Sequence, residues 1–535
     1  MPRRRLALAL LACALIASTG LRVAAGAEKR GLTHDEAITY LATACHQGEY
    51  ARLTTVGAPP LGRWVPAAEW KALLRPDRSL CLATIARDLA HEDVHPPLYF
   101  WLLHGWVRVF GVGVWAGPSL NVVLAALTCL ALLGLARRVL GDPLRAAFVA
   151  SVWLFSPAAI RVFAEARQYE LLAFVAVLFV WACVRVAAPP TRRPARDLAV
   201  LALATAAGAL TQFLFGLVAI VGVALVAAGL WRSRRRLVAP ALLAILAGYA
   251  LFGVLHSGFP LSLARGRAQA ADAAPELLSG RLEATVRTLT EFLLPPVAAA
   301  GVPALVALAV LVAVTAWLGL GGDRDPNAAL PTRAMPLVFA WLALAHAALY
   351  LLFVSPGSAM DAKHLSAVWP FAAFLPVLAL GRLPRRARAA VAVPFAVALV
   401  GAGSVAALDG PPGADGGPAE LERTRGVVLD NVARGVLPRV VWRVPDRAQV
   451  LAADQRRLLA QPETWTSKLR TGYLFVGGIP ASDPRYGNSP VLGRRAAAEI
   501  ARRRELAPVP DPLEPRHVFR VGPARERPRE RGGAR

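Results

Sequence analysis

The feature that most restricts how this sequence can fold is a series of apolar runs, each of roughly 18 or more residues, along its first four hundred positions. A helix of that length crosses about 30 Å of hydrocarbon. Charged residues make up only 18% of the 535 residues and hydrophobic ones 56%, whereas a typical soluble protein carries about 25% charged residues. The sequence therefore predicts a mainly α-helical, polytopic membrane bundle.

The apolar runs predict about eleven spans, at 6–27, 117–136, 146–160, 169–187, 198–211, 214–230, 237–255, 295–319, 335–354, 365–381 and 390–407. With a cytoplasmic N-terminus, the inner segments hold 20 lysine and arginine residues and the short outer loops hold seven. Because basic residues gather on the cytoplasmic side, this orientation is favoured and the C-terminal segment is predicted to be extracytoplasmic. The first run also resembles a cleaved signal peptide, but the polytopic chain after it favours an uncleaved span.

The segment 95–111, HPPLYFWLLHGWVRVFG, is apolar but short for a span. We predict an interfacial helix in the outer headgroup region, where Tyr99, Trp101 and Trp106 would suit that depth. The alternative is a twelfth span, which would reverse the side of every later arginine cluster.

The predicted organisation has a membrane module at 1–407, and this module includes a large outer loop with interfacial helices at 28–116. A linker rich in glycine and proline follows at 408–418. Short strand-like and helical runs predict a small extracytoplasmic α/β domain at 419–523. The final segment, 524–535, is predicted to be a disordered tail.

The net charge of +25 would suggest a nucleic-acid partner in a soluble protein. Here the basic residues stand in short clusters between apolar runs, as topology signals do. We therefore expect membrane lipid, and no nucleic acid, as a partner. Arginine far outnumbers lysine, as in GC-rich bacterial genomes, and this indicates a bacterial plasma (inner) membrane protein.

Two of the five cysteines, Cys45 and Cys81, lie in the polar segment after the first run. In an oxidising compartment they could form a disulfide, and otherwise they would be two free thiols. The other three cysteines lie inside apolar runs.

The predicted spans have no acidic residue near their middle, which argues against ion-coupled transport. Acids and unusual bases gather instead where spans meet the outer surface. They are Asp35 and Glu36, Asp93 and His95, Glu165, Arg167 and Tyr169, and Lys363 and His364. Simpler roles are open for each: helix capping for the first pair and interface anchoring for the others. The segment His91–His95 leaves a divalent metal open, although it lacks the spacing typical of structural zinc.

At these residues the chain resembles the GT-C membrane glycosyltransferases, in particular the protein O-mannosyltransferases and the lipid A aminoarabinose and galacturonic acid transferases (families 39 and 83). The resemblance lies in the Asp35-Glu36 pair, the HPPLY segment from His95, the EARQY segment from Glu165, and Lys363 before a late proline-containing span. It extends in order over roughly residues 1–407. Lys363-His364 departs from the more usual Arg-Tyr, and Gln212-Phe213 departs from the frequent His-Tyr.

The resemblance implies an inverting glycosyltransferase that uses a polyprenyl-phosphate-linked sugar and an unknown glycan, lipid or protein acceptor at the outer face of the membrane. Asp35 would be the general base with Glu36 in support, and cations would stabilise the phosphate leaving group. The donor-binding residues would be Arg167, Lys363, His364, Glu165, Tyr169, His95 and Asp93. A lipid or polysaccharide transporter, or a non-catalytic assembly protein, are the competing hypotheses.

Overall fold

The computed structural model describes residues 2–55, 59–77, 79–187, 193–231, 234–271, 278–290, 302–320, 333–353, 362–409, 419–430, 435–453, 458, 460, 469, 472–475, 490–509 and 518–524. The predicted linker and tail lie almost entirely outside these residues. The chain forms two compact units. We call Met1–Glu28 with Leu82–Pro411 the helical unit, and Lys29–Cys81 with Pro412–Arg535 the sheet unit.

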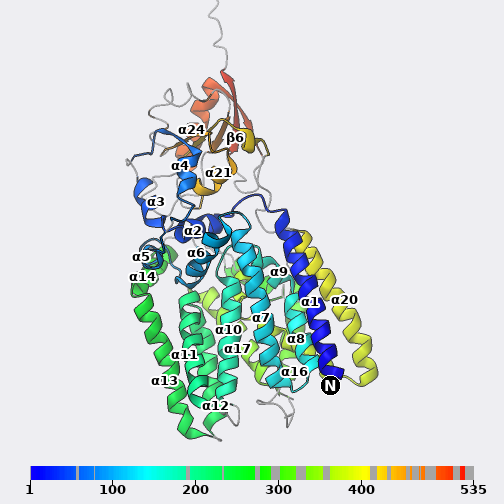
Figure 1. Cartoon of the computed structure of the whole chain (residues 1–535). Helices are drawn as coiled ribbons and strands as arrows, with labels where there is room; N and C mark the ends of the chain where they lie inside the picture. Colours follow the sequence, from blue (N-terminus) through cyan, green and yellow to red (C-terminus); the bar gives the residue numbers. More distant parts are fainter. Residues whose placement is uncertain are drawn as a thin grey trace, which may run out of the picture. The chain divides into compact units, whose positions relative to one another are not determined.

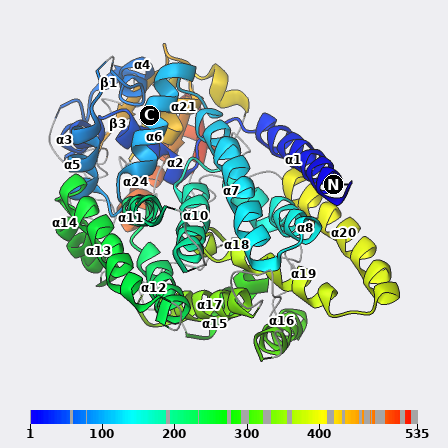
Figure 2. The ribbon, with the colours of Figure 1, turned by 60° about the horizontal axis from the view of Figure 1, so that its bottom comes forward.

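The helical unit is a bundle of apolar helices (Figures 1 and 2). Its central helix α10 packs against α7, α11 and α12, while α1 packs against α8 and α20. The helices are α1 (Pro2–Ala27), α5 (Leu82–Glu92), α6 (Leu98–Phe110), α7 (Ala116–Leu140), α8 (Pro143–Leu154), α9 (Pro157–Phe163), α10 (Tyr169–Ala187), α11 (Pro194–Thr211), α12 (Phe215–Trp231), η1 (Arg235–Leu237), α13 (Val238–Leu255), α14 (Phe259–Ala271), α15 (Leu278–Thr290), α16 (Val302–Leu320), α17 (Ala334–Phe353), η2 (Ala362–Leu365), α18 (Trp369–Ala372), α19 (Phe374–Gly381) and α20 (Arg385–Leu408).

Several of these helices could cross a membrane. Among the described residues, six are long and apolar enough by length and composition alone, and the bent pair α8–α9 would be a seventh. Three further segments, Phe215–Trp231, Leu308–Leu320 and Trp369–Gly381, are apolar but shorter in the described chain. These helices indicate that the chain is a multi-pass membrane protein. The count of eleven spans stays a prediction.

Helix α6 covers the segment predicted to be interfacial. Its 13 residues would extend about 20 Å at 1.5 Å per residue, which is too short for the hydrocarbon core. Tyr99, however, does not face the surface as expected. It is fully buried, and its hydroxyl donates to Asn121 Oδ1 of α7 at 3.2 Å. A buried tyrosine hydroxyl needs a hydrogen-bond partner, and Asn121 supplies it. The interfacial position of α6 stays a prediction.

A buried arginine stabilises the break between α8 and α9, where the two helices bend by 56°. Pro157 begins α9 and cannot continue the hydrogen bonding of α8. The carbonyl of Leu154 therefore accepts from Ser18 Oγ at 2.9 Å and from Arg22 Nη1 at 3.1 Å. The Arg22 guanidinium also lies 5.6 Å from the centroid of the Phe163 ring and interacts electrostatically with Glu170.

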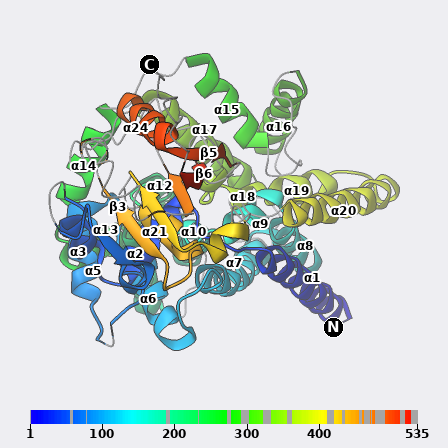
Figure 3. The ribbon, with the colours of Figure 1, turned by 90° about the horizontal axis from the view of Figure 1, so that it is seen from above.

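The sheet unit contains one mixed six-stranded sheet with the order β1-β3-β2-β4-β6-β5 (Figure 3). Strand β2 runs parallel to β3 and β4, and the other neighbours are antiparallel. The elements are α2 (His34–Thr43), α3 (Gln47–Leu53), β1 (Trp64–Pro66), α4 (Ala67–Ala72), η3 (Ala419–Arg423), β2 (Gly426–Leu429), α21 (Leu437–Arg443), β3 (Gln449–Ala452), β4 (Gly472–Phe475), α24 (Pro490–Arg503), β5 (Arg504–Pro508) and β6 (Val518–Ala524). One face of the sheet buries Val428, Leu474 and Val521 against α24 residue Ile500.

This division differs from the predicted one, which placed all of 28–116 in the membrane module. Residues Lys29–Cys81 belong to the sheet unit instead, because β1 pairs with β3 and Lys71 Nζ donates to the carbonyl of Val444 at 2.6 Å. Lys71 also pairs with Asp446 at 2.7 Å and holds the pKa of that carboxyl below its usual range. A strand of three residues has too little periodicity to be recognised in the sequence.

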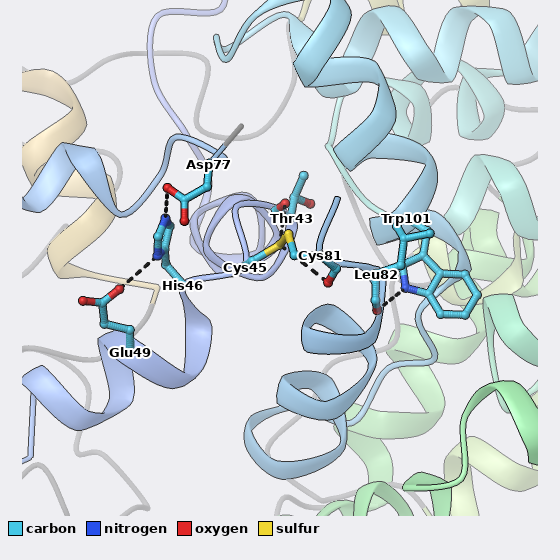
Figure 4. The surroundings of a disulfide bond; sticks show 8 residues. All are labelled: Thr43, Cys45, His46, Glu49, Asp77, Cys81, Leu82 and Trp101. Atoms are coloured by element: carbon cyan, nitrogen blue, oxygen red, sulfur yellow. Dashed lines mark hydrogen bonds and ion pairs between the residues drawn. A yellow bond between two sulfur atoms is a disulfide. The ribbon is translucent and has the colours of Figure 1, made fainter. Parts of the chain in front are cut away.

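Cys45 and Cys81 form a disulfide within the sheet unit (Figure 4). Their Cα atoms are 6.4 Å apart, and the bridge closes a sequence separation of 36 residues. Beside it, the ring of His46 lies between Glu49 and Asp77, with nitrogen–oxygen distances of 3.0 and 3.7 Å. The bridge joins the second residue after α2 to the end of the segment that contributes β1.

Removal of this bridge should destabilise the protein. A closed loop of this length restricts the unfolded chain by about 3–4 kcal/mol. We expect the Cys45→Ser/Cys81→Ser double variant to melt at a lower temperature than the parent chain in detergent. Reductant should lower the melting temperature of the parent and leave that of the variant unchanged. Equal melting of parent and variant in the absence of reductant would contradict the prediction.

Replacement of the buried arginine of α1 should also be damaging. Arg22→Met removes the hydrogen bond to the Leu154 carbonyl, at a cost of about 1–3 kcal/mol for a buried group left without its partner, and leaves the buried Glu170 without the opposing charge of Arg22. We expect a large loss of folded protein in chemical denaturation followed by fluorescence. The matched double variant Arg22→Met/Glu170→Gln should recover part of the loss, and identical stabilities of single and double variants would refute the electrostatic explanation.

Candidate active site

The helical unit brings together four of the predicted site residues, from segments almost two hundred positions apart. Lys363 Nζ of η2 lies 3.6 Å from Glu165 Oε2, in the segment between α9 and α10. The same ammonium lies 5.8 Å from the centroid of the Tyr169 ring, which meets the His364 ring edge-on at 6.2 Å. The Lys363 and Glu165 side chains are 22% and 19% exposed, so a ligand can reach both. We call these four residues the Lys363 cluster.

The backbone of this segment is held from α7. Asn121 Nδ2 donates to the carbonyls of Phe163 and Glu165 at 2.8 and 2.7 Å, and Tyr99 in turn donates to Asn121. A side chain at Gly117 would meet Ala166 Cβ at 2.1 Å, so only glycine permits this close approach of α7. The Glu165 carboxylate is therefore presented by a segment whose main chain is fixed.

Arg167 lies in the same turn but in the interior of the helical unit. Its backbone N–H donates to the carbonyl of Glu165 at 2.7 Å, and the residue is only 4% exposed. The residue therefore brings a buried positive charge two positions after Glu165 in the sequence. Its predicted role in donor binding stays a prediction.

Asp93 and His95 interact with each other ahead of α6. Asp93 Oδ1 accepts from the backbone N–H of Val94 and lies 2.7 Å from His95 Nδ1. The pair shapes the turn that leads into the Pro96-Pro97 segment. Among the described residues, the stretch His91–His95 does not bring three metal-ligand atoms together.

The other predicted pair, Asp35 and Glu36, belongs to the sheet unit at the beginning of α2. Thr33 Oγ1 accepts from the Glu36 backbone N–H at 3.2 Å, and Glu36 Oε2 accepts from the Thr33 backbone N–H at 2.8 Å. This is a capping box. The other oxygen, Glu36 Oε1, forms an ion pair with Lys29 that is almost completely buried. Both Glu36 oxygens are thus engaged in local structure.

Asp35 is half-buried and sits in the first turn of this well-anchored helix. The hydroxyl of Thr39 donates to the Asp35 carbonyl at 2.9 Å. Farther along α2, the Tyr40 ring stacks on Trp442 of α21 at 6.4 Å. The helix that carries Asp35 therefore packs against α21 of the sheet unit through Tyr40.

Sequence reasoning missed three residues that support these sites: Lys29, Asn121 and Arg22. Each of these residues is unusual at its place in the sequence. Lys29 is one of only four lysines in the chain, while Asn121 and Arg22 are polar residues inside apolar runs. Polar groups in such runs require partners, but the partners lie in other helices and only the fold identifies them.

The chain is similar to known proteins in part of its sequence and in its fold. The family described as dolichyl-phosphate-mannose-protein mannosyltransferase matches residues 94–256. A comparison with curated proteins gives no match. Among solved structures, ArnT from Cupriavidus metallidurans bound to undecaprenyl phosphate has a TM-score of 0.53 and 15% identity, over 96% of this chain and 97% of that one. The apo state of the same protein has a TM-score of 0.53 and 14% identity, over the same shares of each chain.

The family match and the shared fold indicate a membrane glycosyltransferase of the GT-C type. An oligosaccharyltransferase from Archaeoglobus fulgidus is a more distant neighbour, with a TM-score of 0.42 and 14% identity over 82% of this chain and 62% of that one. The expected family resemblance and the expected enzyme class are confirmed.

Proposed function

We propose that this chain is an inverting glycosyltransferase that transfers a sugar from a polyprenyl-phosphate donor to an acceptor hydroxyl at the outer face of the membrane. Asp35 is the general base, and Lys363 with Arg167 stabilises the leaving phosphate. The protein acts in the plasma membrane, with a cytoplasmic N-terminus.

The observation that carries the assignment of the base is the different burial of two adjacent carboxylates. Glu36 is fully buried and uses one oxygen for Lys29 and the other for the Thr33 N–H. Asp35 is half-buried on the same helix turn. A general base must reach the proton that it removes, so Asp35 suits this role and Glu36 suits a positioning role.

The Lys363 cluster supports a phosphate-linked donor. A lysine ammonium is a compact positive charge that binds phosphate oxygens, and Glu165 and Tyr169 hold it at a partly exposed position. The similar fold of ArnT was solved with undecaprenyl phosphate bound. A polyprenyl phosphate is therefore the donor carrier that we assign to this chain.

The reaction needs one proton acceptor and one stabilised leaving group. Asp35 takes the proton of the acceptor hydroxyl as its oxygen bonds to the anomeric carbon. The bond between that carbon and the phosphate oxygen breaks, and the polyprenyl phosphate leaves with the electron pair. Cations close to this oxygen lower the barrier because they stabilise charge that grows only in the transition state. Direct attack opposite the leaving group inverts the anomeric centre.

Asp35→Asn should abolish transfer without affecting folding. A general base contributes about 10²–10⁴-fold, so we expect a loss of at least 10²-fold in sugar transfer, measured with the lipid-linked sugar that co-purifies with the protein and is identified by mass spectrometry. Glu36→Gln is the matched control. It should lower the melting temperature, because Lys29 loses its counter-charge, while turnover per folded molecule falls much less. Full transfer by a normally folded Asp35→Asn variant would disprove the role of Asp35.

Lys363→Ala should slow the chemical step. Loss of one charge-stabilising group at a leaving oxygen costs about 10²-fold or more in turnover. Lys363→Arg keeps the charge and should retain more activity than the alanine variant. The measurement is single-turnover transfer with saturating donor. A Lys363→Ala effect confined to donor affinity, with an unchanged single-turnover rate, would assign Lys363 to binding alone.

A further inference from the structure

The sheet unit contains a cavity of about 690 Å³ that the proposed chemistry does not use. It lies where β4, β6 and β5 meet the segment that precedes β2. Its charged and aromatic lining consists of Arg423, Arg425, Tyr473, Glu505 and Arg520. We call these five residues the arginine pocket. Its volume falls within the range of small-molecule sites, about 300–1,000 Å³.

The register of the sheet explains why these side chains meet. Tyr473 of β4 lies directly opposite Arg520 of β6, and directly opposed residues project from the same face of a sheet. Their neighbours Leu474 and Val521 belong to the hydrophobic core on the other face. Since side chains alternate along a strand, the burial of this core fixes Tyr473 and Arg520 on the side away from it.

The other two arginines are held by a structured turn. The hydroxyl of Thr424, between Arg423 and Arg425, donates to the carbonyl of Gly426 at 3.1 Å. The carbonyl of Arg425 accepts from the Gln449 N–H of β3 at 2.9 Å. Both arginines therefore project from a backbone that is tied to the sheet, and a ligand would not have to order it.

The charge of the pocket is unbalanced. Its lining contains three arginines and one acid, Glu505. In the described chain none of these three arginines takes part in an ion pair, whereas Arg502 and Arg503 in the same unit both pair with Glu499. All three are exposed to solvent. Guanidinium groups bind carboxylate and phosphate in a forked geometry, so the pocket suits an anion.

We infer that the arginine pocket binds a sugar that carries a carboxylate or phosphate group. The guanidinium groups hold the anionic group, Glu505 accepts hydrogen bonds from sugar hydroxyls, and Tyr473 forms part of the wall. Asp35, the proposed base, belongs to the same compact unit. The acceptor, rather than the lipid-linked donor, is therefore the substrate assigned to this pocket. This assignment to the acceptor rests on the proposed function and names the acceptor class as an acidic glycan.

Direct binding to the purified full-length chain tests the inference without any turnover. The probes are galacturonic acid, glucose 6-phosphate, glucose and inorganic phosphate, each titrated by isothermal titration calorimetry at low ionic strength. At least one acidic sugar should bind at least tenfold more tightly than both glucose and inorganic phosphate. The preferred acidic sugar identifies the anionic group. Binding of inorganic phosphate as tight as that of both acidic sugars, or equal binding of glucose, would overturn the inference.

Variants locate the binding site. Arg423→Ala/Arg425→Ala/Arg520→Ala should weaken acidic-sugar binding at least tenfold, and Arg520→Lys should have a smaller effect because it keeps the charge. Arg447→Ala, an exposed arginine of the same unit outside the pocket, is the matched control and should leave binding unchanged. Unchanged melting temperatures would show that the variants fold. Binding that survives the triple substitution would refute the site.

The binding test of the arginine pocket and the transfer test of Asp35 can fail independently of each other. Asp35→Asn should retain acidic-sugar binding, because the base is not part of the pocket. Loss of transfer in Asp35→Asn without any acidic-sugar binding to the parent chain would leave the glycosyltransferase proposal intact and overturn the pocket. Acidic-sugar binding to the parent chain together with full transfer by Asp35→Asn would support the pocket and overturn the role of Asp35 as the base.

Discussion

A charge that leaves water needs an opposite charge or several hydrogen bonds, and this constraint governs both units of the chain. Each lysine among the described residues pairs with an acid: Lys29 with Glu36, Lys71 with Asp446, and Lys363 with Glu165. The pairs differ in exposure. The side chains of Lys29 and Glu36 are 1% and 0% exposed, whereas those of Lys363 and Glu165 are about a fifth exposed. Removal of either partner from the first pair would leave a buried charge, while the second pair can exchange its contacts with a ligand.

The same constraint separates the roles of two adjacent carboxylates. Neighbouring residues on a helix point in directions about 100° apart, so Asp35 and Glu36 cannot share one environment. Glu36 lies inside, where Lys29 and the capping box hold its carboxylate in place. Asp35, the preceding residue, lies on the same helix but is only half-buried. In the proposed reaction the ion pair of Glu36 therefore contributes by holding the helix that carries the base.

Sequence patterns predicted those parts of the structure that depend on local composition. Apolar runs located helices in each predicted span, and short strand-like runs at Arg447–Ala452, Gly472–Gly477 and His517–Val521 located β3, β4 and β6. The sequence patterns did not predict which strands pair across long separations in the chain. Strand β1 joins β3 across almost four hundred residues, and nothing in the three residues Trp64–Pro66 identifies that partner. The contact of Lys363 with Glu165 was expected only because both residues fall at the outer ends of predicted spans. The partners of Arg22, namely Leu154 and Glu170, depend on a helix break that the continuous apolar run conceals.

An acidic acceptor would pose an electrostatic problem that the charges of this chain address. The proposed reaction involves two anionic groups, that of the acceptor and the departing phosphate, and each needs positive charge of its own. We assign Lys363 and Arg167 of the helical unit to the phosphate, and the three pocket arginines of the sheet unit to the acceptor. The arginine pocket is exposed, and salt screens exposed charges over about 8 Å at physiological ionic strength. Arg167, by contrast, is buried, and Lys363 is only partly exposed. Added salt would therefore weaken binding of the acceptor more than it weakens stabilisation of the leaving phosphate. The affinity for the acceptor and the rate of the chemical step would then depend differently on ionic strength.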